Sequence, residues 1–292
     1  MGSTTDPRRL IINADDYGIS RGVSIGILEA ARAGGITSAS MIVNLPAFAE
    51  AAERARSAGA LSLGLHLNLT TGHSITPAQS LTRGNTGQFY SLPRLIARAS
   101  LGLIDASDVQ HECVAQIDRM IEAGFQPTHL DSHRHVHAHP SLWRTVLQAA
   151  ASRGVSNVRV PSEPLWTSSR DWRATLKHAG LLLCTRVTRR GAREGAANHF
   201  FGISLQGGGS FAPRLFALIP QLPPGTSELM THPGHADQEL AEHDGYTRQR
   251  DEELRVLCSK GFRDLLVRCR IDLASFDRAP RSTRKGELTQ HH

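Results

Sequence analysis

The sequence predicts an α/β fold in which parallel strands and helices form a (β/α) barrel. Short apolar runs alternate with helical segments along most of the chain, and several of these runs end in acidic or histidine residues. Such alternation is typical of βαβ units with a parallel sheet. A doubly wound sheet with a dinucleotide site has no support, because no GxGxxG sequence follows the first strand. In a barrel, the functional residues gather at the carboxyl ends of the strands.

The first part of the chain is expected to form three strands separated by two helices. Ser20 is suited to cap the first helix, which Gly34 ends, and Gly59 ends the second helix. In the third strand, His66 lies on the polar face opposite four alternating leucines. The strands are predicted at 10–16, 36–43 and 61–69, and the second helix at 47–57.

Glycines and prolines then indicate a long loop or insertion at 70–105, and loops of this length are often functional lids or disordered. A capping-box match at Ser107 begins the next helix, which Gly124 ends. The pattern at 161–209 predicts no single type of element. Further strands are predicted at 127–132, 155–160, 228–231 and 271–276, and further helices at 142–153, 211–219 and 246–259.

The length of 292 residues and the hydrophobic content of 40% are enough for one large α/β domain. We predict a single barrel over residues 1–292, with disordered tails at 1–7 and 279–292. No apolar run approaches the roughly 18 residues of a membrane span, and no signal-peptide stretch stands at the N-terminus. A cytoplasmic location is therefore expected.

The net charge of +6 suggests a nucleic-acid partner at first sight. Nearly all the basic residues are arginine and most are dispersed, and no groove-reading motif accompanies them, so we predict no nucleic-acid binding. The four cysteines contain no CxxC pair, which argues against a zinc knuckle or a disulfide framework.

Two adjacent acids, Asp15 and Asp16, end the first apolar run. Neighbouring carboxylates beside a core repel each other and are costly to desolvate unless a cation or a proton relieves them. An exposed turn is the alternative. The pair therefore suggests a place where a metal ion and a proton are handled together.

Other strand ends supply histidines, and the segment from His129 to His139 has His or Asp at every odd position. Asp16, His66 and His133 could bind a divalent ion through one carboxylate and two imidazoles. Asp15 could then take a proton from water, and His232 could protonate a leaving group. The alternatives are a solvated histidine-rich loop, a core position for His66 and a structural turn at His232. His137 and His139 are expected to be loop or capping residues.

Four motifs follow one another along the chain: NADDYG at 13–18, GLHLNLT at 64–70, THLDSHRHVH at 128–137 and MTHPG at 230–234. In sequence and in order, they resemble the motifs of the YdjC family of carbohydrate deacetylases, which includes the chitooligosaccharide deacetylases. A weaker match, GQFYS, lies at 87–91.

The resemblance implies a distorted (β/α) barrel related to polysaccharide deacetylases. It implies one divalent metal ion bound by Asp16, His66 and His133, with Asp15 as the base and His232 as the acid. Mg²⁺ is the ion associated with the family, whereas two imidazoles make Zn²⁺ or another transition metal equally plausible.

Three further residues, Arg159, Asp131 and His135, are candidates for substrate contact, and Arg159 could instead orient Asp15 or form an ion pair. Departures from the family pattern at Arg134 and His235 concern the choice of substrate and not the reaction.

The predicted function is metal-dependent hydrolysis of the N-acetyl group of an N-acetylglucosamine-type sugar, with release of acetate. The substrate could be a soluble oligosaccharide or a lipid-linked, hopanoid-type glycan. A metal-dependent phosphoesterase and a non-catalytic sugar-binding barrel are the competing hypotheses. Oligomeric state stays open, with a homodimer as one option.

Overall fold

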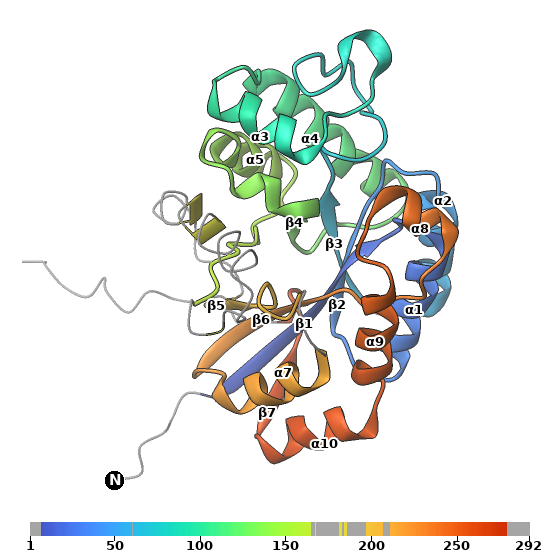
Figure 1. The fold of residues 1–292 in the computed structure, drawn as a ribbon, viewed down its shortest axis with the longest axis vertical. Coiled ribbons are helices and arrows are strands. Elements are labelled where there is room, and N and C mark those ends of the chain that lie inside the picture. Colours follow the sequence, from blue (N-terminus) through green and yellow to red (C-terminus); the bar gives the residue numbers. More distant parts are fainter. Residues whose placement is uncertain are drawn as a thin grey trace, which may run out of the picture.

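A computed structural model describes residues 7–59, 61–164, 167, 181–182, 184–185, 197–206 and 211–278 of the chain. Its centre is a curled sheet of seven strands, all of whose pairings are parallel (Figure 1). The order is β4-β3-β2-β1-β6-β5, and β7 also pairs with β1. The strands are β1 (Arg8–Tyr17), β2 (Ser38–Met41), β3 (Ser62–Leu67), β4 (Leu130–Ser132), β5 (His199–Phe201), β6 (Gly225–Thr231) and β7 (Ile271–Ala274).

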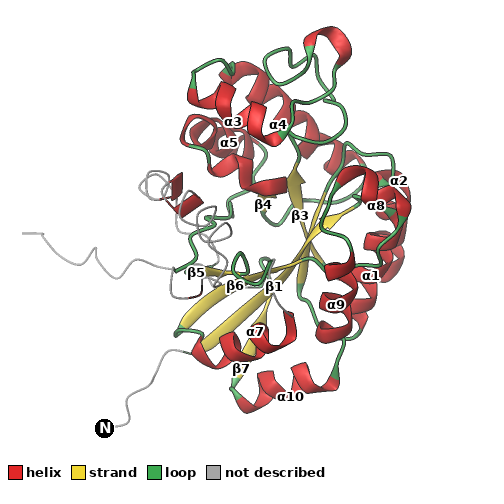
Figure 2. Ribbon diagram, viewed as in Figure 1, coloured by secondary structure: helices red, strands yellow, loops and turns green. Residues whose placement is uncertain are grey.

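Helices surround this sheet and cover its outer side (Figure 2). The α-helices are α1 (Arg21–Arg32), α2 (Phe48–Ala58), α3 (Leu92–Ser100), α4 (Ala106–Glu122), α5 (Pro140–Ser152), α7 (Phe211–Leu218), α8 (Gln238–His243), α9 (Arg248–Leu257) and α10 (Lys260–Arg268). Short 3-10 helices are η1 (Gly84–Thr86), η2 (His133–Ala138) and η4 (Ile219–Gln221). The expected distorted (β/α) barrel is confirmed as a half-barrel, since no pairing closes β4 onto β5 within these described ranges.

Strand β1 is central because both of its edges are paired. One edge pairs with β6 along residues 8–14, and the other pairs with β7 at 8–11 and then with β2 from Asn13 onward. Between Ala14 and Tyr17 the register against β2 shifts, so that three steps along β1 match two along β2. Asp16 sits in this irregularity with a φ of 69°, a left-handed conformation that is uncommon outside glycine. The acid pair therefore lies at a break in the strand.

Burial explains why the first three strands lie where they do. Leu10, Ile12, Leu65 and Leu67 are fully buried in the main hydrophobic core, as expected for parallel strands covered by helices. Ser20 caps α1 by accepting a hydrogen bond from the N–H of Val23, as its position predicts. These local features place the carboxyl ends of β1, β3 and β4 together.

Several predicted elements need correction. The expected strand at 155–160 is wrong: it makes only one isolated bridge, from Val158 to Leu130, and Pro161 brings no N–H to continue the ladder. The 70–105 segment is not wholly irregular, because α3 lies inside it with Leu95 and Ala99 buried. Helices α8 and α10 were not expected. α8 is a single polar stretch of six residues, whereas α10 has nine residues and buries Phe262, Leu265 and Leu266.

Some predictions lie outside the described residues. The tails expected at 1–7 and 279–292 do so, apart from Pro7, and so does most of the 161–209 region. Where the chain is described, no helix combines the length and the apolar character needed to cross a membrane.

Gly64 allows β3 to pass close to a buried histidine ring, and this gives a test of the packing. A Cβ on Gly64 would lie 2.4 Å from the ring of His129, which itself stacks on Phe276 at a centroid distance of 3.8 Å. We expect Gly64→Ala to lower the free energy of unfolding by about 1–3 kcal/mol through overpacking, measured by urea denaturation. Gly245→Ala is the control, because its methyl would meet no atom within 4 Å. Equal stability of the two variants would contradict the prediction.

Candidate metal centre and active site

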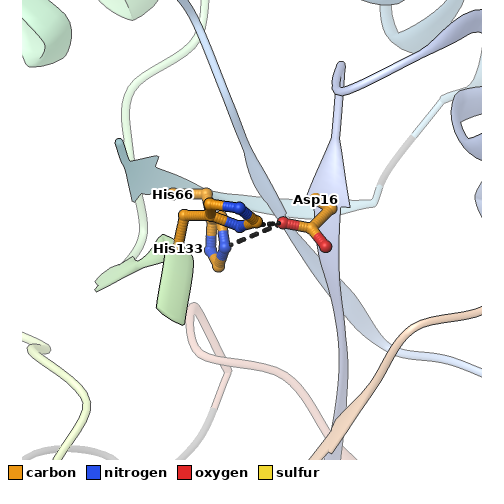
Figure 3. Close-up of side chains that lie close together, drawn as sticks. All are labelled: Asp16, His66 and His133. Carbon is orange, nitrogen blue, oxygen red and sulfur yellow. Dashed lines mark hydrogen bonds and ion pairs between the residues drawn. The ribbon is translucent and has the colours of Figure 1, made fainter. Parts of the chain in front are cut away.

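Three of the predicted residues meet at the carboxyl ends of β1, β3 and β4 (Figure 3). One oxygen of Asp16, Oδ1, lies 3.1 Å from His66 Nε2 and 2.9 Å from His133 Nδ1. All three side chains are buried. His66 comes from β3, and His133 begins the 3-10 helix that follows β4. Two imidazoles thus face a single carboxylate oxygen in the interior of the half-barrel.

Asp131 fixes the ring of His66 from the other side. Its Oδ1 lies 2.7 Å from His66 Nδ1, and its Oδ2 accepts a hydrogen bond from Ser40 at 2.9 Å. Burial lowers the pKa of His66, but the carboxylate of Asp131 outweighs this and raises the pKa to about 10. A carboxylate on the far nitrogen is the usual way in which proteins orient a metal-binding imidazole.

The donor set fits a divalent cation. Asp16, His66 and His133 offer ligand atoms that all lie within 4.8 Å of one another, and the second nitrogen of His133 has no hydrogen-bond partner in the described part of the chain. Two imidazoles and one carboxylate are typical ligands of a transition metal. Without a cation, the ring nitrogens that face Asp16 Oδ1 would each have to carry a hydrogen, because their lone pairs would otherwise be repelled by the carboxylate oxygen. The site therefore has the composition and the spacing of a three-ligand metal centre.

A second group of possible ligand atoms comes from Asp15, His66 and Asp131. In this group, the guanidinium of Arg159 supplies the positive charge. The guanidinium of Arg159 forms two hydrogen bonds with Asp15, from Nη1 at 2.6 Å and from Nη2 at 2.7 Å. Nη2 also lies 2.7 Å from Asp131 Oδ2, and Nε lies 2.6 Å from Glu228 Oε1. Because Arg159 fills this position, the described residues leave one place for a metal ion.

The Arg159 network also sets the ionisation of its acids. Burial opposes ionisation of Asp15 and Asp131, but Arg159 holds the pKa of each carboxyl below its usual value. Burial dominates at Glu228, whose pKa rises to about 7 despite Arg159. Asp15 is therefore a carboxylate at neutral pH, while Glu228 titrates near neutrality.

His232 follows β6, at the same end of the sheet as the acid pair. Ala14 of β1 is in register with Thr231 of β6, so Asp15 and His232 are the next residues on neighbouring strands. The backbone N–H of His232 donates to Glu253 at 2.6 Å, and the ring lies 5.6 Å from that of Tyr246. His232 is thus bonded to α9, and the register between β1 and β6 places His232 beside Asp15.

The remaining histidines of the central motif divide into separate roles. His137 is fully buried, contacts Ser132 and lies 2.9 Å from the carbonyl oxygen of Arg159, while His139 is the N-cap of α5. The capping role of His139 agrees with the expectation, whereas His137 is a buried, hydrogen-bonded residue of η2 instead of an ordinary loop residue. His135 lies close to Phe200, at a centroid distance of 5.9 Å, and burial lowers its pKa well below the usual range.

The interactions of the three candidate substrate residues differ. Arg159 and Asp131 are buried and engaged with each other and with their neighbours, so neither presents a free polar group to a ligand. His135 is only partly buried, and its Nδ1 has no hydrogen-bond partner among the described residues.

Arg250 was not predicted as a site residue. Its Nη2 lies 2.6 Å from Oδ2 of Asp16, the oxygen that faces away from the imidazoles, and its side chain is fully buried. It belongs to the run from Arg248 to Glu253, RQRDEE, whose polar and charged residues resemble those of an exposed helix surface. Glu228 gave no clear signal, because the strand that contains it, GTSELMT, mixes polar and apolar residues.

A cavity of about 720 Å³ opens on the same side of the sheet. Its walls include residues 70–73, Gln88, Phe89 and Arg134, and Arg134 directly follows the metal-ligand candidate His133. The 70–105 segment therefore forms part of a hollow that reaches Arg134, the residue after His133. Its volume is within the range of about 300–1,000 Å³ that is typical of small-molecule sites.

The half-barrel holds a buried His-His-Asp cluster that forms a candidate metal centre, and comparison with known proteins identifies the family. The model of the family described as YdjC-like protein matches residues 9–268. The chain belongs to the YdjC-like family.

Several relatives match along nearly their whole length. A carbohydrate deacetylase of Geobacillus stearothermophilus is 35% identical, with 86% of this chain and 89% of the relative aligned. A chitooligosaccharide deacetylase of Citrobacter koseri is 32% identical, over 92% and 98% of the two chains. The crystal structure of a protein from Enterococcus faecalis V583 superposes with a TM-score of 0.74 at 26% identity, covering 93% and 98% of the two chains.

The buried Arg159 network predicts a large loss of stability on truncation. Arg159→Met leaves two carboxylates and Glu228 without their common partner, and we expect the free energy of unfolding to fall by about 3–5 kcal/mol. Arg153→Met is the matched control, since Arg153 pairs with Asp118 at the surface, where both side chains are over a third exposed. Its loss should stay below about 1 kcal/mol. Urea denaturation measures both variants, and equal losses would contradict a supporting role for Arg159.

Proposed function

We propose that the protein is a metal-dependent carbohydrate deacetylase, which hydrolyses the N-acetyl group of an N-acetylglucosamine-type sugar and releases acetate. One observation carries the proposal: Asp16 Oδ1 faces two buried imidazoles, and the adjacent Asp15 is a separately bound carboxylate. Membership of the YdjC-like family and the names of the relatives support the choice of substrate class.

Asp16, His66 and His133 are the proposed ligands of one divalent ion. The ion, when bound, would polarise the acetamide carbonyl and make a water molecule more acidic. The two imidazoles favour a transition metal such as Zn²⁺ over Mg²⁺, which prefers oxygen ligands. Asp131 acts in this proposal as the residue that orients His66, instead of as a substrate contact.

Asp15 is the proposed general base. Its Oδ1 accepts hydrogen bonds from Arg159 and Asn13, at 2.7 and 2.8 Å, whereas Oδ2 accepts a bond only from Arg159 among the contacts described. A carboxylate oxygen can accept more than one hydrogen bond, so Oδ2 keeps a free lone pair. We assign this atom to receive the proton of the attacking water, while Arg159 holds the carboxylate in place.

His232 is the proposed general acid. As water oxygen adds to the acetamide carbon and the C–N bond breaks, the sugar nitrogen needs a proton to leave as an amine. His232 would supply this proton from the neighbouring strand end. Before the next turnover, Asp15 would release the proton it took from water and His232 would regain one, by exchange with solvent. The hydrogen bond from its backbone N–H to Glu253 and the ring of Tyr246 support its position.

The cavity beside the centre would hold the sugar. Its walls come partly from the 70–105 segment, including the motif residues Gln88 and Phe89. We therefore assign this segment to substrate binding. Variation within it would change which N-acetylated glycan is accepted without changing the catalytic groups.

The different roles proposed for Asp15, the base, and Asp16, the metal ligand, give the main test of the function. Wild-type protein should release acetate from N,N′-diacetylchitobiose, as measured by a coupled acetate assay, or from a lipid-linked N-acetylated glycan. Asp15→Asn should lower kcat/KM by about 10²–10⁴-fold with bound metal retained, because only the base is lost. Asp16→Asn is the isosteric control and should lose the metal, as measured by elemental analysis. Full activity of Asp15→Asn would disprove the base assignment, and no acetate from either substrate would disprove the function.

The acid role of His232 predicts dependence on the leaving group. His232→Asn should lower hydrolysis of the acetamide by about 10²–10⁴-fold. It should have little effect on 4-nitrophenyl acetate, whose leaving group needs no proton. Asp15→Asn should slow both reactions, because both need an activated water. Equal losses of the two activities in His232→Asn, compared in initial-rate assays, would show that His232 is not the acid.

A further inference from the structure

The two oxygens of Asp16 have different partners. Oδ1 faces His66 and His133, at 3.1 and 2.9 Å, whereas Oδ2 lies 2.6 Å from Nη2 of Arg250. All of these groups are buried. The guanidinium beside Oδ2 would repel a second cation at that oxygen, so a metal ion is favoured at Oδ1, the oxygen that faces the imidazoles.

Arg250 is itself held by groups from the connection between α8 and α9. Its Nη2 donates to Asp244 at 3.0 Å, and its Nε donates to the carbonyl oxygen of Tyr246 at 2.7 Å. Its Nη1 is buried with no hydrogen-bond partner in the described ranges, an arrangement that disfavours folding and gains nothing for stability. The guanidinium is therefore a fixed group, and optimal packing of the core does not account for it.

The same helix also holds the other half of the proposed catalytic site. Glu253 lies one turn after Arg250 on α9, accepts the backbone N–H of His232 through Oε2 and accepts the hydroxyl of Tyr246 through Oε1, both at 2.6 Å. α9 thus contacts Asp16 through one residue and His232 through another. This arrangement fixes the ligand and the acid relative to each other.

We propose that Arg250 is a positioning residue that makes Asp16 bind the metal ion through Oδ1 alone. The inference rests on the proposed metal centre and adds a residue to it. A positive charge near a cation opposes its binding, whereas a fixed carboxylate favours it. In this rigid buried setting, orientation outweighs repulsion, since groups that hold metal ligands typically contribute 10–100-fold to metal affinity.

Two substitutions of Arg250 distinguish its effect on the orientation of Asp16 from the effect of its positive charge. Arg250→Lys keeps the charge but lacks the forked guanidinium, and Arg250→Met removes both. We expect the dissociation constant for Zn²⁺, measured by competition with a chromophoric chelator, to rise by about 10–100-fold in both variants. Asp244→Asn, which weakens the anchor of Arg250 and leaves Arg250 itself in place, should give a smaller rise. It serves as the second variant if Arg250→Met does not fold.

Arg54→Met is the matched control, because Arg54 pairs with Glu50 at the surface and should leave the Zn²⁺ affinity unchanged. Unchanged or tighter binding in both Arg250 variants would overturn the proposal, since charge repulsion would then dominate. Normal affinity in Asp244→Asn together with normal affinity in Arg250→Lys would also overturn it. A wild-type protein that binds no Zn²⁺ would instead disprove the metal centre, which is a distinguishable result.

Discussion

The guanidinium of Arg159, buried among three acids, is the interaction on which the site depends. Asp15 lies on β1, Glu228 on β6 and Asp131 on β4, and Arg159 contacts all three from the segment that bridges to β4. Since β3, β2 and β1 separate β4 from β6 in the sheet, the side chain spans the interior of the half-barrel. Without this shared cation, three carboxyl groups would lie in a nonpolar interior, where ionised acids are strongly disfavoured. Arg159 therefore links β4 to β1 and β6 across the half-barrel and compensates the acids in its interior.

Two arginines also resolve the repulsion between the adjacent acids. Arg159 pairs with Asp15, and Arg250 pairs with the outer oxygen of Asp16. Burial opposes ionisation of both acids. Arg159 nevertheless keeps the pKa of Asp15 below its usual value, and Arg250 together with His133 does the same for Asp16. Because each carboxylate has its own partner, one can serve as a ligand while the other accepts a proton. The break in β1, with its left-handed Asp16, lets neighbouring side chains reach these separate partners.

The elements outside the sheet contribute to different parts of the site. Helix α9 contacts the centre from one side through Arg250 and Glu253. The 70–105 segment lies on another side, and Glu112 of α4 anchors it by accepting hydrogen bonds from Ile75 and Thr76. The wall of the cavity thus comes in part from a segment separate from the strands and helix that hold the centre.

Local sequence patterns determined the strand and helix alternation and the ligand candidates Asp16, His66 and His133. Those residues follow apolar runs, and the ends of parallel strands meet at one edge of a sheet. The partners of these residues could not be predicted, because they depend on contacts between distant parts of the chain: Asp16 and Arg250 are 234 positions apart. The single bridge at Val158 and the buried roles of Asp131 and His129 likewise arise from packing across the half-barrel. The pairing of Arg159 with Asp15 was one of the alternatives that the sequence offered. The sequence alone thus determined which groups reach the site, and the tertiary structure decided which charge each one meets, because ion pairs in a buried interior form between neighbours in space.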